Sequence, residues 1–218
     1  MSRPVDARSF FDAIAGRYDR EYAPPREESH ARMKRIVGEL PPQSKVLDLG
    51  VGTGRELSSL QDAGHDVTGL DWSPEMLARC ARRTRPVPLI LADFWERLPF
   101  EAGAFGAVIA LHGTLAHPPR ESALEALGIE TARVLSPGGL FIAELPLPGW
   151  MTKASDQDER RPRRVAETRV VVRDDATGAA IEASLLPSAT WQALLCKGLS
   201  LRKAVETEHE LLLVAEKS

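Results

Sequence analysis

Hydrophobic and polar positions follow two different periods along the chain. Short apolar runs typical of buried β-strands occupy residues 45–50, 66–71, 88–93, 107–111 and 139–145. Segments with helical spacing separate them, at about 55–63, 74–83 and 121–135. Strands that are apolar on both faces and alternate with helices predict an α/β fold, in which helices cover both sides of a mainly parallel sheet.

Helices are expected ahead of the first strand. Apolar side chains from Phe10 to Tyr22 recur at spacings of three and four, which predicts one amphipathic helix that ends before the sequence APPRE. A second apolar stripe, from Met33 to Leu40, predicts another helix, which the two prolines at 41–42 end.

The alternation stops after residue 147. Residues 153–164 are charged and have no apolar anchor, so we expect an exposed, mobile connection there. Two strand-like runs around a turn that contains Asp174 and Gly178 predict a β-hairpin. A short helix and a terminal pair of strands complete the expected order.

Composition narrows the classes of partner. Lys and Arg number 28 against 31 Asp and Glu, a net charge of -3, which disfavours nucleic acid and anionic membranes as partners. No apolar run approaches the roughly 20 residues of a membrane span, and residues 1–16 lack the layout of a signal peptide. A cytoplasmic protein is therefore expected. Cys80 and Cys196 are far apart in apolar helical contexts, so we expect buried thiols.

The sequence KVLDLGVGTGRELSSL at 45–60 carries the strongest chemical signal. Glycines stand at positions 50, 52 and 54, but the third glycine of a G-x-G-x-x-G dinucleotide motif would fall at Arg55. Asp48, at the end of the strand, would repel a pyrophosphate but suits a cationic group such as an ammonium. Such a turn alone is equally compatible with close packing of helix on strand.

Several motifs in the same order resemble the class I S-adenosylmethionine-dependent methyltransferases, over residues 7–146 and the terminal strands. LDLGVGTG is similar to the glycine-rich first motif of that family, ADFWERLPF to the third, and ARVLSPGGLFIAE to the segment entering the fifth strand. FFDAIAGRYDREYA resembles the helix that closes over the cofactor in methyltransferases of ubiquinone and menaquinone biosynthesis. The resemblance implies a Rossmann-like, mostly parallel seven-stranded sheet flanked by helices, with a β-hairpin inserted after the fifth strand. It also implies S-adenosyl-L-methionine as cofactor, S-adenosyl-L-homocysteine as product, and no metal.

The resemblance also implies roles for individual residues. The backbone at Gly50 and Gly52 would lie against the methionine part of the cofactor, and Asp48 would bind its amino group. Asp71 would accept the ribose hydroxyls, and Trp72 would offer a face to adenine. The remaining residues expected at the cofactor are Tyr18, Gly54, Met76, Asp93, Phe94 and Leu111.

Other roles are open for some of these residues. Asp71 precedes a helix that Ser73 would cap with Pro74 at its first position, so it suits a helix N-terminus as well. Trp72 and Tyr18 would also suit core positions.

Candidate acceptor residues follow the fourth strand. His112 and His117 lie in LHGTLAHPP, at the edge where the methyl acceptor should bind, and histidine is suited to acid–base work near neutral pH. Glu144, at the end of the fifth strand, faces the same edge. An isolated histidine is also a common structural residue. The loop lacks the N-P-P-Y or D-P-P-Y typical of enzymes that methylate adenine, cytosine or glutamine, which favours a small-molecule acceptor.

We therefore expect one domain, a monomer or homodimer, that methylates an O, N or C nucleophile of a small molecule. Its parts would be capping helices at 1–42, a cofactor-binding core at 43–147, an insertion over the acceptor site at 148–186, and a final helix and strands at 187–218. One alternative is a family member that uses S-adenosylmethionine without methyl transfer. Another is a nucleotide-dependent oxidoreductase, which the missing third glycine disfavours.

Overall fold

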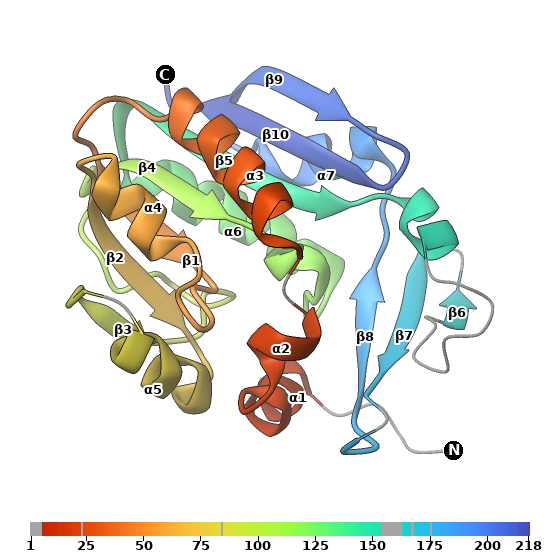
Figure 1. Cartoon of the computed structure of the whole chain (residues 1–218). Helices are drawn as coiled ribbons and strands as arrows, with labels where there is room; N and C mark the ends of the chain where they lie inside the picture. Colours follow the sequence, from red (N-terminus) through yellow and green to blue (C-terminus); the bar gives the residue numbers. More distant parts are fainter. Residues whose placement is uncertain (1–5, 23, 84, 154–162, 167, 175) are drawn as a thin grey trace.

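A seven-stranded sheet forms the centre of the protein in the computed structural model, which describes residues 6–22, 24–83, 85–153, 163–166, 168–174 and 176–218 (Figure 1). The strand order is β3-β2-β1-β4-β5-β10-β9. The strands are β1 (Lys45–Leu49), β2 (Asp66–Asp71), β3 (Leu89–Leu91), β4 (Phe105–Ala110), β5 (Leu135–Pro146), β9 (Ser200–Glu206) and β10 (Glu210–Glu216). From β3 to β5 neighbouring strands are parallel, whereas β10 is antiparallel to both β5 and β9. The predicted α/β class and mostly parallel sheet are confirmed.

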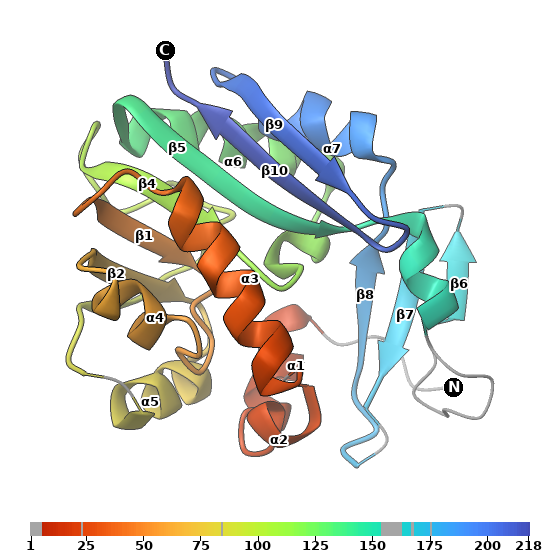
Figure 2. The same ribbon diagram turned by 45° about the horizontal axis from the view of Figure 1, so that its top comes forward.

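Helices cover both faces of the sheet, as Figure 2 shows. The helices on one face are α3 (Arg26–Glu39), α4 (Leu57–Asp62) and α5 (Pro74–Arg83), and those on the other are α6 (Glu121–Val134) and α7 (Ser188–Leu195). Successive side chains of a strand point to opposite faces. Val46 accordingly packs with the α3 and α4 side chains, and Leu47 packs with those of α6 and α7. The central strands are therefore apolar on both faces.

The N-terminal segment forms two helices, so the single helix predicted from its pattern is wrong. Helix α1 (Ala7–Ile14) ends before Gly16, and α2 (Tyr18–Tyr22) begins after it. Glycine costs a helix about 1 kcal/mol relative to alanine. The Arg17 amide donates to the Ile14 carbonyl at 3.0 Å, a tighter turn than the α-helical one. The chain bends at this point.

The insertion after β5 carries a second, smaller sheet. A short 3-10 helix, η2 (Pro148–Lys153), leads to β6 (Arg163–Ala166), β7 (Arg169–Arg173) and β8 (Ala180–Ser184), which pair antiparallel in that order. The predicted hairpin is confirmed as β7–β8, and β6 is an additional strand. The mobile connection expected at 153–164 falls mainly outside the described residues.

Helices α1 and α2, which we call the cap, meet the insertion at the end of the sheet toward which the parallel strands point (Figure 1). Phe10 and Ile14 of α1 pack with Ile181 of β8 and Met76 of α5. The C-terminal ends of the parallel strands face the cap and the insertion, at the edge where ligands bind in open α/β sheets.

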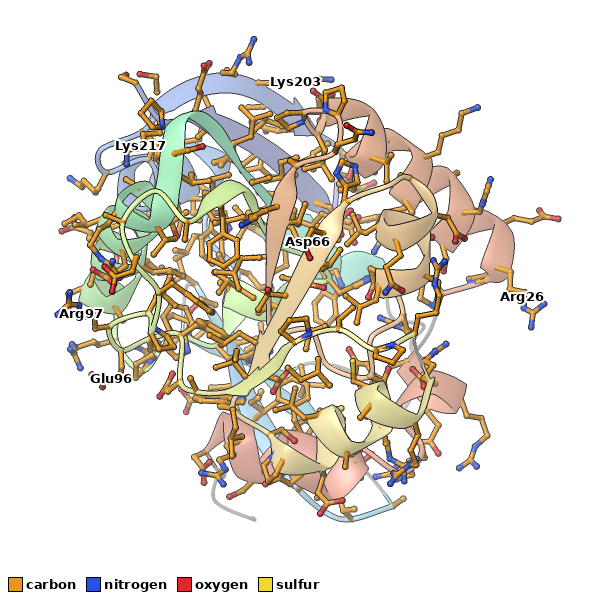
Figure 3. The ribbon with its side chains drawn as sticks, turned by 90° about the vertical axis from the view of Figure 1, so that its left-hand side faces the viewer. Arg26, Asp66, Glu96, Arg97, Lys203 and Lys217 are labelled. Atoms are coloured by element: carbon orange, nitrogen blue, oxygen red, sulfur yellow. The ribbon has the colours of Figure 1, made fainter. Side chains whose placement is uncertain are left out.

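Charged side chains such as Arg26, Glu96 and Arg97 project at the outer surface (Figure 3). Within the described part of the chain, no helix has both the length and the apolar character needed to cross a membrane. Cys80 is buried as predicted, but Cys196 is only half-buried because it lies at the C-terminal end of α7, where the helix leaves the core.

Candidate functional site

The glycine-rich loop turns sharply between β1 and α4. Gly50, Gly52 and Gly54 have φ angles of 71°, 55° and 74°, in the left-handed region that favours glycine. A Cβ on Gly50 would lie 2.4 Å from Cγ2 of Thr114, whereas one on Gly52 would meet nothing nearer than 3.9 Å. Gly50 therefore permits close packing on the loop after β4, while Gly52 leaves open space. Close packing therefore accounts for the glycine at position 50, and the expected cofactor contact at Gly50 and Gly52 stays a prediction.

Asp71 joins three parts of the site. Its Oδ2 accepts from the Gly52 amide at 2.8 Å, and its Oδ1 accepts from the Ser73 amide at 2.9 Å. Ser73 Oγ accepts from the Met76 amide at 3.1 Å, which confirms the predicted cap of α5. Burial raises the pKa of Asp71, although hydrogen bonds from the Ser73 and Gly52 amides oppose that rise. The carboxylate keeps free lone pairs for further donors.

Asp48 is a buried carboxylate to which none of the described residues donates a hydrogen bond. Only 3% of the residue is exposed. Burial, with the nearby charges of Glu56 and Asp71, raises its pKa well above the usual range. A buried charge of this kind is costly unless a group of opposite charge pairs with it. Asp48 therefore suits a cationic ligand group.

A narrow groove of about 70 Å³ runs beside this loop. The predicted cofactor residues that line it are Tyr18, Gly50, Gly52, Asp71, Trp72, Met76 and Phe94. The sequence analysis missed four others, Phe11, Trp95, Gly113 and Thr114, because they lie at positions that the motifs do not mark. At one end the rings of Trp72 and Phe94 lie 6.1 Å apart, which provides an aromatic surface.

Four predicted cofactor residues lie outside the lining of the groove. Asp48 is buried behind the loop, and Gly54 closes its turn. Asp93 Oδ1 accepts from the Trp95 amide at 2.9 Å, and so holds the aromatic end in place. Leu111 packs in the core layer beneath α3.

A larger cavity of about 370 Å³ adjoins the groove. Phe11, Tyr18, His112, Gly113 and His117 line both spaces. Helices α1 and α2, the β7–β8 hairpin and the end of β5 supply its mostly apolar walls. Its volume is in the range of small-molecule pockets, about 300 to 1,000 Å³.

His112 is held on both sides of its ring. Nδ1 lies 2.7 Å from Arg32 Nη1, and Nε2 pairs with Glu56. Arginine can only donate, so Nδ1 accepts and Nε2 carries the proton that Glu56 receives. Burial alone would raise the pKa of Glu56, but the hydrogen bond from His112 and the positive charge of Arg55 lower it. Neither nitrogen of His112 is free to take a proton from a ligand.

His117 has the opposite arrangement. Its Nδ1 lies 2.7 Å from the Glu182 carbonyl oxygen. A carbonyl only accepts, so Nδ1 carries the proton and Nε2 keeps its lone pair. No described residue pairs with Nε2, and the Phe11 ring packs edge-on at 5.7 Å. Burial lowers the pKa of His117, so the ring is neutral near pH 7.

Arg55 is a further site residue that the sequence analysis did not mark. Its guanidinium carbon lies 5.3 Å from the centre of the Tyr18 ring, a cation–π contact. Arg55 Nη1 and Trp95 Nε1 are both buried without an acceptor among the described residues. Together with Asp48, these donors match a ligand that has a carboxylate, an ammonium and a heteroaromatic base. The residues present therefore fit S-adenosylmethionine.

Comparisons with known proteins agree with this geometry. Residues 46–139 match a methyltransferase domain family. Demethylmenaquinone methyltransferase of Beutenbergia cavernae is 35% identical over 153 residues, which cover 67% of this chain and 61% of that protein. This chain thus matches less than two thirds of the relative's length.

Two solved structures share the fold over nearly the whole chain. The CcbJ methyltransferase from Streptomyces caelestis has a TM-score of 0.76 and 20% identity, and covers 98% of this chain and 100% of its own. The sugar N-methyltransferase KedS8 from Streptoalloteichus has a TM-score of 0.74 and 23% identity, with coverages of 100% and 96%.

The sheet order and the glycine-rich loop define a Rossmann-like methyltransferase fold. The chain belongs to the class I S-adenosylmethionine-dependent methyltransferases.

Proposed function

We propose that this protein transfers a methyl group from S-adenosylmethionine to an O, N or C nucleophile of a small molecule, with His117 as the base. The observation that carries the proposal is the place of His117. It lines both the groove and the larger cavity, and its Nε2 is unprotonated and unpaired among the described residues. The names of a demethylmenaquinone methyltransferase and a sugar N-methyltransferase among the similar proteins support a small-molecule acceptor.

The groove residues would hold the cofactor by complementary chemistry. Asp48 would pair with its ammonium, because this carboxylate is buried, and Arg55 with its carboxylate, because Arg55 Nη1 has no acceptor among the described residues. Asp71 would accept the ribose hydroxyls, and Trp72 and Phe94 would contact adenine. When bound, S-adenosylmethionine supplies a methyl group activated by the positive charge on its sulfur.

The cap would control access to the groove. A groove of about 70 Å³ is well below the size of small-molecule pockets, so α1 and α2 would shift when the cofactor enters. Phe11 and Tyr18, which line both the groove and the larger cavity, would then exclude water from the place where the two spaces meet. Exclusion of water strengthens the electrostatic interactions inside a site.

The insertion would cover the acceptor. Trp150, Val172 and Ile181 line the larger cavity from η2 and the β7–β8 hairpin. An apolar wall on this side would orient a small acceptor toward His117. The described residues of η2 and the β7–β8 hairpin at this cavity support such a role for the insertion.

The two histidines would have different tasks. His117 would take the acceptor's proton, since Glu182 fixes the tautomer that leaves Nε2 free. His112 would instead position Arg32 and Glu56, because both its nitrogens are engaged.

The test compares His117→Gln with His209→Gln. His209 Nδ1 also lies 2.8 Å from a backbone carbonyl, that of Gly149, but His209 lies outside both spaces, so it is a matched control. Release of S-adenosylhomocysteine would be measured with a panel of amines, phenols and activated carbon acids. A positioned base contributes about 10²- to 10⁴-fold. His117→Gln should lose turnover by such a factor, while calorimetric affinity for S-adenosylhomocysteine changes less than twofold.

The pH dependence of turnover gives a second measurement. The pKa of His117 lies below its usual value, so the neutral base persists below pH 6.5 and is lost only as pH falls further. The wild-type rate should show this acid limb, and His117→Gln should lack it. Equal turnover of the His117→Gln and His209→Gln variants would exclude His117 as the base.

A further inference from the structure

The larger cavity has one strongly polar end, where α3, β5 and β10 meet. Arg32 of α3 lies there among three carboxylates, with shortest distances of 3.6 Å to Glu28, 3.4 Å to Glu144 and 3.5 Å to Glu210. All four residues line the cavity. One guanidinium against three carboxylates leaves a surplus of negative charge at this end.

Other charged groups around the cavity do not remove the surplus. Arg55 lies 3.9 Å from Glu56 and over the Tyr18 ring, on the side of the glycine-rich loop. Glu21, the remaining carboxylate of the lining, pairs with Arg17 and Arg20. Burial lowers the pKa of His117, so this ring is neutral near pH 7, and His112 is engaged by Arg32 and Glu56 on both sides of its ring.

The carboxylates at the polar end keep acceptor capacity. Glu144 is 6% exposed in its side chain and accepts from the His112 amide at 3.2 Å. The side chains of Glu28 and Glu210 are 50% and 37% exposed. Their distances to Arg32 exceed the 2.7–2.9 Å of strong charge-assisted hydrogen bonds. A ligand with several N–H donors would therefore find free oxygens here.

We infer that the methyl acceptor is a primary or secondary amine on an apolar body, received as its ammonium by Glu210, Glu28 and Glu144. The inference rests on the proposed function and names its substrate class. An acceptor with a carboxylate or phosphate near its nucleophile would be repelled by the same surplus charge. A neutral alcohol or phenol would gain no comparable charge interaction. The apolar walls, which include Phe10, Ile14 and Val172, suit the remainder of the molecule.

The surplus charge also suits the chemistry of an amine. An ammonium and a sulfonium repel each other, and the carboxylates offset that repulsion while both are bound. His117 Nε2 takes one ammonium proton, which leaves a lone pair on nitrogen. That lone pair forms the new N–C bond to the methyl carbon while the C–S bond breaks and its electron pair stays on sulfur. The methylated nitrogen then carries the positive charge and can lose a proton.

Three probes of nearly equal shape test the inference by binding alone. They are 4-phenylbutylamine, 4-phenylbutanol and 4-phenylbutyrate, measured by calorimetry on the full chain with and without saturating S-adenosylhomocysteine. The amine should bind at least tenfold more tightly than the alcohol, and the carboxylate should bind most weakly. The preference should weaken as salt rises, because screening reduces interactions between partly exposed charges.

Substitutions of Glu28 and Glu210 test whether these carboxylates cause the preference for the amine. Glu28→Gln with Glu210→Gln should lower amine affinity at least tenfold and leave alcohol affinity within twofold. Both side chains are partly exposed, so the variant should fold. Glu206→Gln, on the exposed edge strand β9, is the matched control and should change neither.

The outcomes separate the two proposals. Failure to bind S-adenosylhomocysteine would count against the proposed function, whereas the amine preference is measured without turnover. Equal, reversed or undetectable binding of the three probes would overturn the inference. An amine affinity that survives in the Glu28→Gln, Glu210→Gln variant would also overturn it.

Discussion

Replacing Gly50 by alanine should separate the packing role of the glycine-rich loop from its ligand-binding role. Gly50 has φ of 71°, and its added Cβ would lie 2.4 Å from Thr114 Cγ2 and 2.9 Å from Thr114 Oγ1. Two costs therefore combine at this position. One is a non-glycine residue in the left-handed region, and the other is overlap with a packed side chain.

The magnitude follows from these two costs. Left-handed backbone costs a non-glycine residue about 1 to 2 kcal/mol. Overpacking of a filled site costs about 1 to 3 kcal/mol. Gly50→Ala should therefore lower the free energy of unfolding by about 2 to 5 kcal/mol.

Other glycines of this chain provide the matched controls. Gly64 has φ of 85° and open space where its Cβ would stand, so Gly64→Ala reports the backbone cost alone, about 1 to 2 kcal/mol. Adding Thr114→Ala to Gly50→Ala removes both of the nearest atoms, and the remaining Thr114 Cβ lies 3.2 Å away. The double variant should recover about 1 to 3 kcal/mol.

Gly52 completes the comparison. Its φ is 55° and its Cβ would meet no atom closer than 3.9 Å, so Gly52→Ala should cost stability like Gly64→Ala. It should nevertheless weaken binding of S-adenosylhomocysteine, because the new methyl group enters the space proposed for the ligand.

Urea unfolding gives the stabilities and calorimetry the affinities. The packing argument would be refuted if Gly50→Ala cost no more than Gly64→Ala, or if Thr114→Ala failed to rescue it. Unchanged affinity in Gly52→Ala would refute the assignment of ligand space beside that glycine.

Two further predictions concern packing away from the loop. Asp174, whose side chain is 1% exposed, pairs with Arg17 and accepts from Tyr22 Oη at 3.2 Å, so Asp174→Asn should lower the unfolding free energy by about 3 kcal/mol near pH 7. Arg17 and Thr177 outweigh burial and hold the pKa of Asp174 below its usual value. The stabilisation by the Asp174 carboxylate is therefore complete above the unfolded pKa of about 3.9 and is lost as pH falls below it. A stability difference between Asp174→Asn and wild type that stays constant from pH 7 to pH 3 would contradict this role of Asp174. Gly128→Ala in α6 would place a Cβ 2.6 Å from the Leu195 carbonyl oxygen and should cost about 1 to 3 kcal/mol, whereas Gly38→Ala in α3, with no atom within 4 Å, should stabilise by about 0.5 to 1 kcal/mol. Thermal unfolding of Gly128→Ala and Gly38→Ala checks this prediction. Equal shifts of the melting temperature in both variants would show that the α6–α7 contact accommodates the added methyl group without loss of stability.

Local patterns in the sequence were sufficient for the order of the strands in the central sheet and of the helices between them. Strands of the central sheet bury both faces, so β1, β2 and β4 appear as short runs with apolar centres within a residue or two of their actual bounds. Left-handed turns need glycine, so the loop at 50–54 was visible from its spacing alone. Ser73 and Pro74 likewise marked the start of α5 through rules that involve only neighbouring residues.

Tertiary structure decided the charges and proton positions at the site. Glu28 and Arg32 are one turn apart in α3, but Glu144 and Glu210 meet Arg32 only because α3 packs across the sheet where β10 pairs with β5. The residues next to His112 and His117 in the sequence do not distinguish the two histidines. Arg32 and Glu56 bind both ring nitrogens of His112, whereas a carbonyl of β8 binds only Nδ1 of His117. Periodicity records which face of an element is buried, but not which distant group that face meets. The hydrogen-bond partners of these residues could therefore be identified only from the tertiary structure.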